Sequence, residues 1–203
     1  MRKNSPKGEK TLFASLLLSA PGPIVTGISV LLSFSATQIA DFLRRTTELA
    51  AIIVAWKVYR KLRQSADIDQ TEKARLERLA NRYAGGAMVC SGVLLFVITI
   101  FQMYSYKPGG NVTMGLVVAS LGVLVNTWFW FRYRFLNNEK QDAVIAVQQK
   151  LYRAKSFADV CVVVALAAVA IAPTHPATRY IDTIGSIIIT FYLLWNGLKT
   201  LRK

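Results

Sequence analysis

Charged residues are scarce in this sequence, and histidine and cysteine are scarcer still. Of its 203 residues, 18% are Asp, Glu, Lys or Arg, whereas soluble domains carry about a quarter. The charges are grouped in a few segments between long apolar runs, which excludes a soluble globular enzyme and a disordered protein. The two cysteines, Cys90 and Cys161, show neither a disulfide framework nor a metal-binding spacing. The single histidine, His175, falls in an expected loop.

Six apolar runs are each long enough to cross a lipid bilayer. A membrane-spanning helix needs about 20 predominantly apolar residues, and the runs cover residues 12–34, 36–59, 83–106, 113–133, 150–171 and 180–198. Together they occupy most of the chain. The sequence therefore predicts an all-α polytopic membrane protein with six transmembrane helices. We expect residues 1–203 to form one transmembrane domain without a cytoplasmic C-terminal domain.

Prolines and glycines mark where the spans bend or end. Residues 21–23, Pro-Gly-Pro, interrupt the first span, so we expect a kink there. Residues 107–110 and 174–176 have the composition of turns between spans. Because residues 56–82 contain no Gly or Pro, helices are expected to extend past the membrane on both sides of residues 65–70.

The basic residues predict the orientation of the chain. The formal net charge is +14, and in a polytopic membrane protein such an excess is typical of the positive-inside rule. With the N-terminus inside, twenty Lys and Arg residues lie in inside segments and only two, Lys107 and Arg179, lie outside. This predicts cytoplasmic termini in a plasma membrane or bacterial inner membrane. The basic ends lack interleaved aromatic residues, so no nucleic-acid partner is expected.

Six ionisable residues fall at membrane depth, where each costs roughly 2.5–3.5 kcal/mol at a helix centre. Arg44 and Glu48 are four residues apart in the second span, so they share a helix face. Lys155 and Asp159 have the same spacing in the fifth span. The remaining two, which form a further pair of that spacing, are Asp41 and Arg45. These charges are either ion pairs that hold two helices together or a polar transport site between them.

The order of five motifs resembles the transmembrane domain of the cation diffusion facilitator family. In the second span the family carries a stretch like S-x-A-L-L-A-D-A-x-H-S-x-x-D, and residues 35–48 read SATQIADFLRRTTE. The family's H-x-x-x-D of the fifth span corresponds to residues 155–159, KSFAD. Residues 75–80 (RLERLA), 126–132 (NTWFWFR) and 181–182 (ID) are similar to its motifs around the third, fourth and sixth spans.

The resemblance implies a secondary transporter rather than an enzyme. It implies divalent cation efflux by proton antiport in a homodimer, with no cofactor other than the divalent metal ion carried as substrate. Small residues of the third span could then pack against a neighbouring helix or a dimer partner; they are Ala84, Gly85, Gly86, Ala87, Ser91 and Gly92.

The family's metal site takes two residues, His or Asp and then Asp, from each of the second and fifth spans. Here Arg44 and Lys155 stand at the His-type positions, and a guanidinium cannot coordinate a metal. Glu48 and Asp159 remain as candidate metal ligands, with Asp41 assisting. Such oxygen ligands suit Mn²⁺, Mg²⁺ or Ca²⁺ better than Zn²⁺.

Two other functions are open at this point. The protein could be a non-transporting scaffold or partner subunit of a transporter, in which ion pairs replace the metal site. It could instead carry another solute, with Arg44 and Lys155 recognising an anionic group. Loss of both His-type positions favours these two alternatives, whereas the retained carboxylates favour cation transport.

Overall fold

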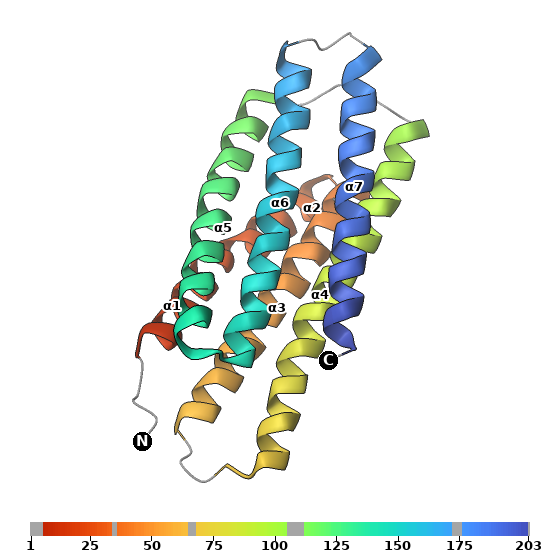
Figure 1. Ribbon diagram of the computed structural model, residues 1–203. Helices are drawn as coiled ribbons and strands as arrows, with labels where there is room; N and C mark the ends of the chain where they lie inside the picture. The colour runs from red at the N-terminus through yellow and green to blue at the C-terminus, as the bar shows by residue number, and fades with distance from the viewer. Residues whose placement is uncertain (1–5, 34–35, 65–67, 105–111, 172–175, 203) are drawn as a thin grey trace.

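The computed structural model describes residues 6–33, 36–64, 68–104, 112–171 and 176–202 (Figure 1). These residues are almost entirely helical, and no strand occurs within the described ranges. The described helices are α1 (Pro6–Ser19), α2 (Pro21–Ser33), α3 (Ala36–Gln64), α4 (Gln70–Tyr104), α5 (Val112–Lys140), α6 (Ala143–Ile171) and α7 (Pro176–Leu201). The all-α prediction is confirmed, and the first predicted span corresponds to α1 and α2 together.

The expected interruption of the first span lies at Pro21. Helix α1 ends at Ser19 and α2 begins at Pro21, a position where proline suits a helix because its missing N–H would have no partner there. The Thr26 hydroxyl donates a hydrogen bond to the Gly22 carbonyl at 3.0 Å. A threonine hydroxyl bond to the carbonyl four residues earlier is of the kind that often bends a helix.

Helices α5 and α6 are joined by a turn of two residues. Helix α5 continues to Lys140, well past the predicted span, and Gln141 then takes a φ of 45°. The Asp142 carboxylate accepts a hydrogen bond from the Val144 N–H at 3.0 Å, which caps the start of α6. Helix α4 likewise begins at Gln70, so the expected helical extensions beyond the spans are present. The turn predicted at 107–110 lies outside the described residues, as do residues 174–175 of the turn predicted at 174–176, and Pro176 is the first residue of α7.

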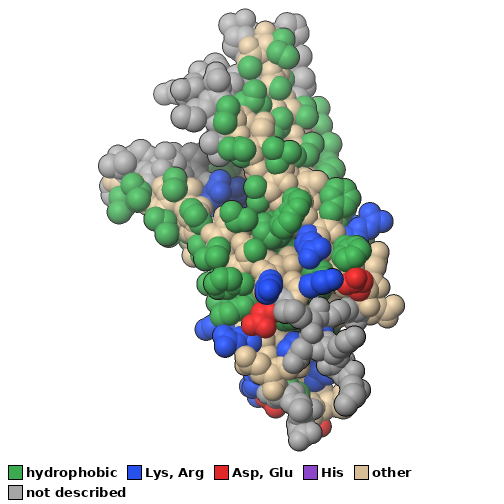
Figure 2. Space-filling model, turned by 90° about the vertical axis from the view of Figure 1, so that its left-hand side faces the viewer, with side chains coloured by type: hydrophobic (Ala, Val, Ile, Leu, Met, Phe, Trp, Pro, Cys, Tyr) green, Lys and Arg blue, Asp and Glu red, His purple; other side chains and the backbone are tan. Residues whose placement is uncertain are grey.

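The chain is a polytopic membrane protein. Within the described residues, three segments are long and apolar enough to cross a bilayer by length and composition, namely Lys7–Ile28, Gln70–Phe101 and Thr183–Leu201. Large apolar side chains such as Leu124, Phe101 and Phe191 are more than half exposed, which is typical of surfaces that face lipid. Figure 2 shows hydrophobic side chains along one face, with most of that face's charged side chains toward its lower end.

The helices form a bundle. The end of α3, the start of α4 and the α5–α6 turn lie at its lower end in Figure 1, together with the first turn of α1 and the last turn of α7. Helices α5 and α6 pack together, α7 packs on α4, and α3 joins α4 to α1 and α2. Buried hydroxyl groups tie α1 to this bundle, since Ser15 and Tyr133 hydrogen-bond at 2.7 Å. The fold therefore places α3, α5 and α6 around a shared space.

Glycines bring α4 and α7 into close contact. A Cβ atom on Gly197 would lie 2.9 Å from the Val89 backbone nitrogen and 3.0 Å from the Gly85 carbonyl oxygen. A Cβ atom on Gly85 would lie 3.0 Å from the Gly197 carbonyl oxygen. Part of the small-residue surface predicted for the third span thus packs against α7 within one chain.

We expect Gly197→Ala to lower the thermal stability of the detergent-solubilised protein. The added methyl group would push apart two backbones that have no room for it, and overpacking typically costs about 1–3 kcal/mol. Gly86→Ala is the matched control, because a Cβ atom there meets nothing within 4 Å. It should leave the melting temperature unchanged or raise it slightly. Equal melting temperatures for both variants would contradict the proposed close packing.

Candidate ion-transport site

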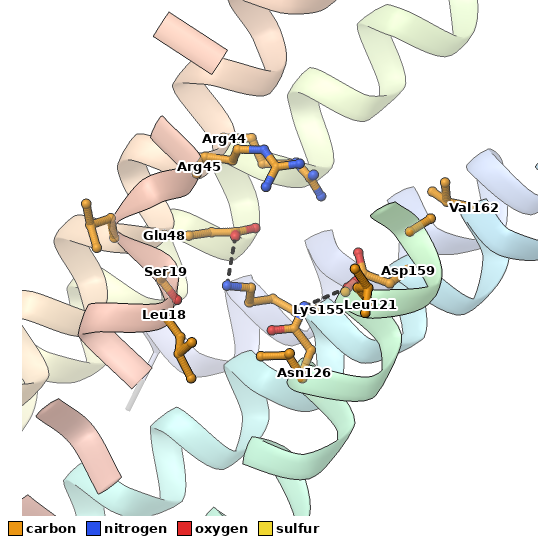
Figure 3. Close-up of a pocket in the computed structure, with 15 residues that line it drawn as sticks. Leu18, Ser19, Arg44, Arg45, Glu48, Leu121, Asn126, Lys155, Asp159 and Val162 are labelled. Atoms are coloured by element: carbon orange, nitrogen blue, oxygen red, sulfur yellow. Dashed lines mark hydrogen bonds and ion pairs between the residues drawn. The ribbon is translucent and has the colours of Figure 1, made fainter. Parts of the chain in front are cut away.

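A cavity of about 600 Å³ lies between α1–α3 on one side and α5–α6 on the other (Figure 3). Most of its wall is apolar, with Leu18, Leu49 and Val125 among the lining side chains. The charged side chains that line it are Arg44, Arg45, Glu48, Lys155 and Asp159. These residues belong to α3 and α6, so the structure brings the predicted residues of the second and fifth spans to one place.

An ion pair between α3 and α6 crosses the cavity. The Lys155 Nζ atom lies 3.2 Å from Glu48 Oε2, and the two side chains are only 14% and 10% exposed. The Ser91 hydroxyl of α4 donates a hydrogen bond of 3.4 Å to the other carboxylate oxygen, Oε1. The Lys155 ammonium also lies 5.0 Å from the centre of the Tyr152 ring. Glu48 is therefore held by donors from two other helices.

Asp159 has a different partner on α5. The Asn126 side-chain amide donates a hydrogen bond of 2.6 Å to Asp159 Oδ2. Gly122, one turn earlier on α5, allows this approach, because a Cβ atom there would lie 3.0 Å from the same oxygen. The spacing correctly placed Lys155 and Asp159 on one helix face. The described ion pair of Lys155, however, runs across helices to Glu48.

Arg44 and Arg45 point into the space between α3 and α6 (Figure 3). Arg44 lies within electrostatic range of both cavity carboxylates. Arg45 approaches the break of the first span, where a Cβ atom on Gly22 would lie 3.4 Å from its Cδ. The side chain of Asp41 lies outside the described part of the structure, so its expected assistance stays a prediction.

The chemistry of this cavity is mixed. It offers two carboxylates as oxygen ligands, and each already accepts a hydrogen bond from a neighbouring helix. Among the described residues, no group of three or more His, Cys, Asp and Glu side chains could hold a metal ion. The assignment of Glu48 and Asp159 as metal ligands stays a prediction.

Two contributors to the site were not among the predicted site residues. Asn126 hydrogen-bonds to Asp159. It is the first residue of the motif at 126–132 that is similar to the family's, and this position in the motif could have identified it as a site residue. Ser91 was grouped with small packing residues, and only the fold shows that its hydroxyl reaches Glu48.

Comparison with known proteins identifies the family. No curated protein matches the chain significantly. The family model for the cation efflux transmembrane domain matches residues 12–203, which is nearly the whole chain. Members of this family are transporters rather than enzymes. The chain belongs to the cation efflux, or cation diffusion facilitator, family of membrane cation transporters.

Proposed function

We propose that the protein exports a divalent cation in exchange for protons. Glu48 and Asp159 would bind the cation, and the Lys155 ammonium would pair with Glu48 when no cation is bound. The observation that carries this proposal is the 3.2 Å ion pair between Lys155 and Glu48 in a cavity that Asp159 also lines. Ionisable residues inside membrane spans are rare and usually belong to ion or proton pathways.

The ion pair suggests how the exchange would work. In the observed state the ammonium group of Lys155 compensates the charge of the Glu48 carboxylate. An arriving divalent cation repels this ammonium, which must then lose its proton or move away. In the proposed exchange this proton leaves to the cytoplasm, the side from which the cation arrives. Lys155 takes up a proton from outside after the cation has been released there, so the cation and the proton cross the membrane in opposite directions. Oxygen ligands favour Mn²⁺, Mg²⁺ or Ca²⁺ over Zn²⁺.

Uptake into proteoliposomes that contain a pH-sensitive dye tests the proposal. We expect uptake of Mn²⁺, Mg²⁺ or Ca²⁺ together with a rise of the internal pH, because protons leave the liposome as the cation enters. The uptake rate of Asp159→Asn should be at least tenfold lower. The control is Glu139→Gln, which removes an exposed carboxylate outside the cavity and should transport normally. Transport by Asp159→Asn at the native rate would contradict the assigned site.

A second candidate is a non-transporting scaffold or partner subunit. The same ion pair favours it, because Lys155 holds Glu48 and the described residues offer no cluster of three metal-ligating groups. Here the charges would lock α3 to α6. Correctly folded protein that moves none of the tested metals and no protons would support this candidate over transport.

We also propose that both termini face the cytoplasm of a plasma membrane or bacterial inner membrane. In a background with Cys90→Ala and Cys161→Ala, a cysteine introduced by Ser65→Cys should resist impermeant reagents in intact cells. A cysteine introduced by Asn111→Cys should react with them, because the basic residues concentrate on the opposite side. Labelling of the Ser65→Cys variant from outside would reverse the orientation.

The family resemblance further leads us to propose a homodimer. Cross-linking of the protein in native membranes, followed by mass measurement in detergent, would distinguish a dimer from a monomer. A monomer in both measurements would contradict this proposal.

A further inference from the structure

Among the described residues that line the cavity, positive side chains outnumber negative ones. Among its lining residues, Arg44, Arg45 and Lys155 are cationic, whereas Glu48 and Asp159 are anionic. We propose that the cavity also binds a small oxyanion, a phosphate group, through Arg44 and Arg45. This inference does not depend on cation transport, because it concerns binding in the absence of any divalent metal.

The hydrogen bonds around the two carboxylates support an anion site. Lys155 pairs with Glu48 at 3.2 Å, and Asn126 donates to Asp159 at 2.6 Å. The two acids therefore have close partners on other helices. A guanidinium has five N–H donors in a planar fork, so each arginine can hold an oxyanion in addition to a neighbouring side chain.

The residue type at these two positions also favours an oxyanion. Guanidinium keeps its charge at any physiological pH, and its fork binds phosphate or carboxylate oxygens in pairs. Two consecutive arginines line the same cavity, and Figure 3 shows both side chains entering it from α3. In a low-dielectric surrounding their attraction for an anion is stronger than in water.

The size of the cavity fits a molecule better than a bare ion. Its volume of about 600 Å³ lies within the range of roughly 300–1,000 Å³ that is typical of small-molecule sites. Such sites combine apolar walls with a few polar groups, and here Leu18, Leu49 and Leu121 accompany the charged side chains. A metal ion held by the carboxylates alone would leave most of this space unused.

Binding can be measured by thermal stabilisation of the metal-free protein in two arms. In the first, protein in phosphatidylcholine nanodiscs with EDTA is titrated with inorganic phosphate, while sodium chloride keeps the ionic strength constant. In the second, the nanodiscs contain phosphatidic acid and the buffer contains no phosphate. Stabilisation in the first arm indicates a soluble anion, and stabilisation in the second alone indicates a lipid headgroup.

Variants identify the binding groups. We expect Arg44→Gln and Arg45→Gln each to weaken the response at least tenfold, whereas Arg134→Gln, which removes an exposed arginine of α5, should respond like the native protein. Arg45→Lys keeps the charge without the fork, so it should fold and still bind more weakly. No stabilisation of the native protein in either arm, or an undiminished response in the Arg44 and Arg45 variants, would overturn the proposal.

Discussion

The double change Glu48→Lys with Lys155→Glu is expected to keep most of the thermal stability that each single change to alanine removes. Glu48→Ala leaves the Lys155 ammonium without its partner, and Lys155→Ala leaves the carboxylate without its own. Breaking a buried ion pair typically costs about 3–5 kcal/mol, and polar contacts in membranes are often weaker, about 1–2 kcal/mol. We therefore expect each alanine variant to lose on the order of 2 kcal/mol, measured by thermal unfolding in detergent.

A second exchange of residues tests whether Lys155 pairs with Glu48 across helices or with Asp159 within α6. From spacing alone, the double change Lys155→Asp with Asp159→Lys should lower the thermal stability only slightly, because it exchanges two residues of one helix. In the structure it places a second carboxylate beside Glu48 and removes the acceptor of the Asn126 amide. We expect this variant to be less stable than Lys155→Ala. If it is more stable than the cross-helix exchange, the described pairing is wrong.

The double change Arg44→His with Lys155→His is expected to create zinc binding that the native protein lacks. Both positions line the same cavity as Glu48 and Asp159, so the variant would gather two imidazoles and two carboxylates. These are ligands that tetrahedral zinc prefers. In the native protein a guanidinium and a protonated ammonium stand at these positions, and neither can coordinate zinc.

Zinc-dependent unfolding of the two proteins, purified side by side, measures this gain. A ligand at about one hundred times its dissociation constant stabilises by about 2.7 kcal/mol, so the melting temperature of the variant should rise by several degrees. The control adds Asp159→Asn to the double-histidine variant and should lose most of the response. Equal zinc responses of native and double-histidine protein would contradict the shared site.

The sequence predicts the helices well because lipid leaves little choice of backbone structure. Every backbone group in the membrane core must be paired within the protein, and a run of about 20 apolar residues has the length of a helix that crosses the bilayer. The break at Pro21 was predictable for the same reason, since proline cannot donate the hydrogen bond that continues α1. The packing of Gly85 against Gly197 was not predictable, because small residues permit close contact with a neighbouring helix but do not specify which helix it is.

The grouping of the charged residues was predictable from the sequence, but their pairing was not. Spacing shows which charges share a face of α3 or of α6. Two pairs with this spacing line one cavity, namely Arg44 with Glu48 and Lys155 with Asp159. Spacing within a helix cannot show which neighbour a long side chain reaches. That choice depends on how α3, α5 and α6 are arranged, which decides that Lys155 meets Glu48 and that Asp159 meets Asn126.

The short connection at Gln141 and Asp142 has a consequence for how the protein is made. Because two residues join α5 to α6, the contacts between these helices are local in sequence and can form as soon as both have left the ribosome. The contact between Gly85 and Gly197 joins residues more than a hundred positions apart. The glycine face of α4 therefore remains without this partner in the bilayer until α7 has been synthesised.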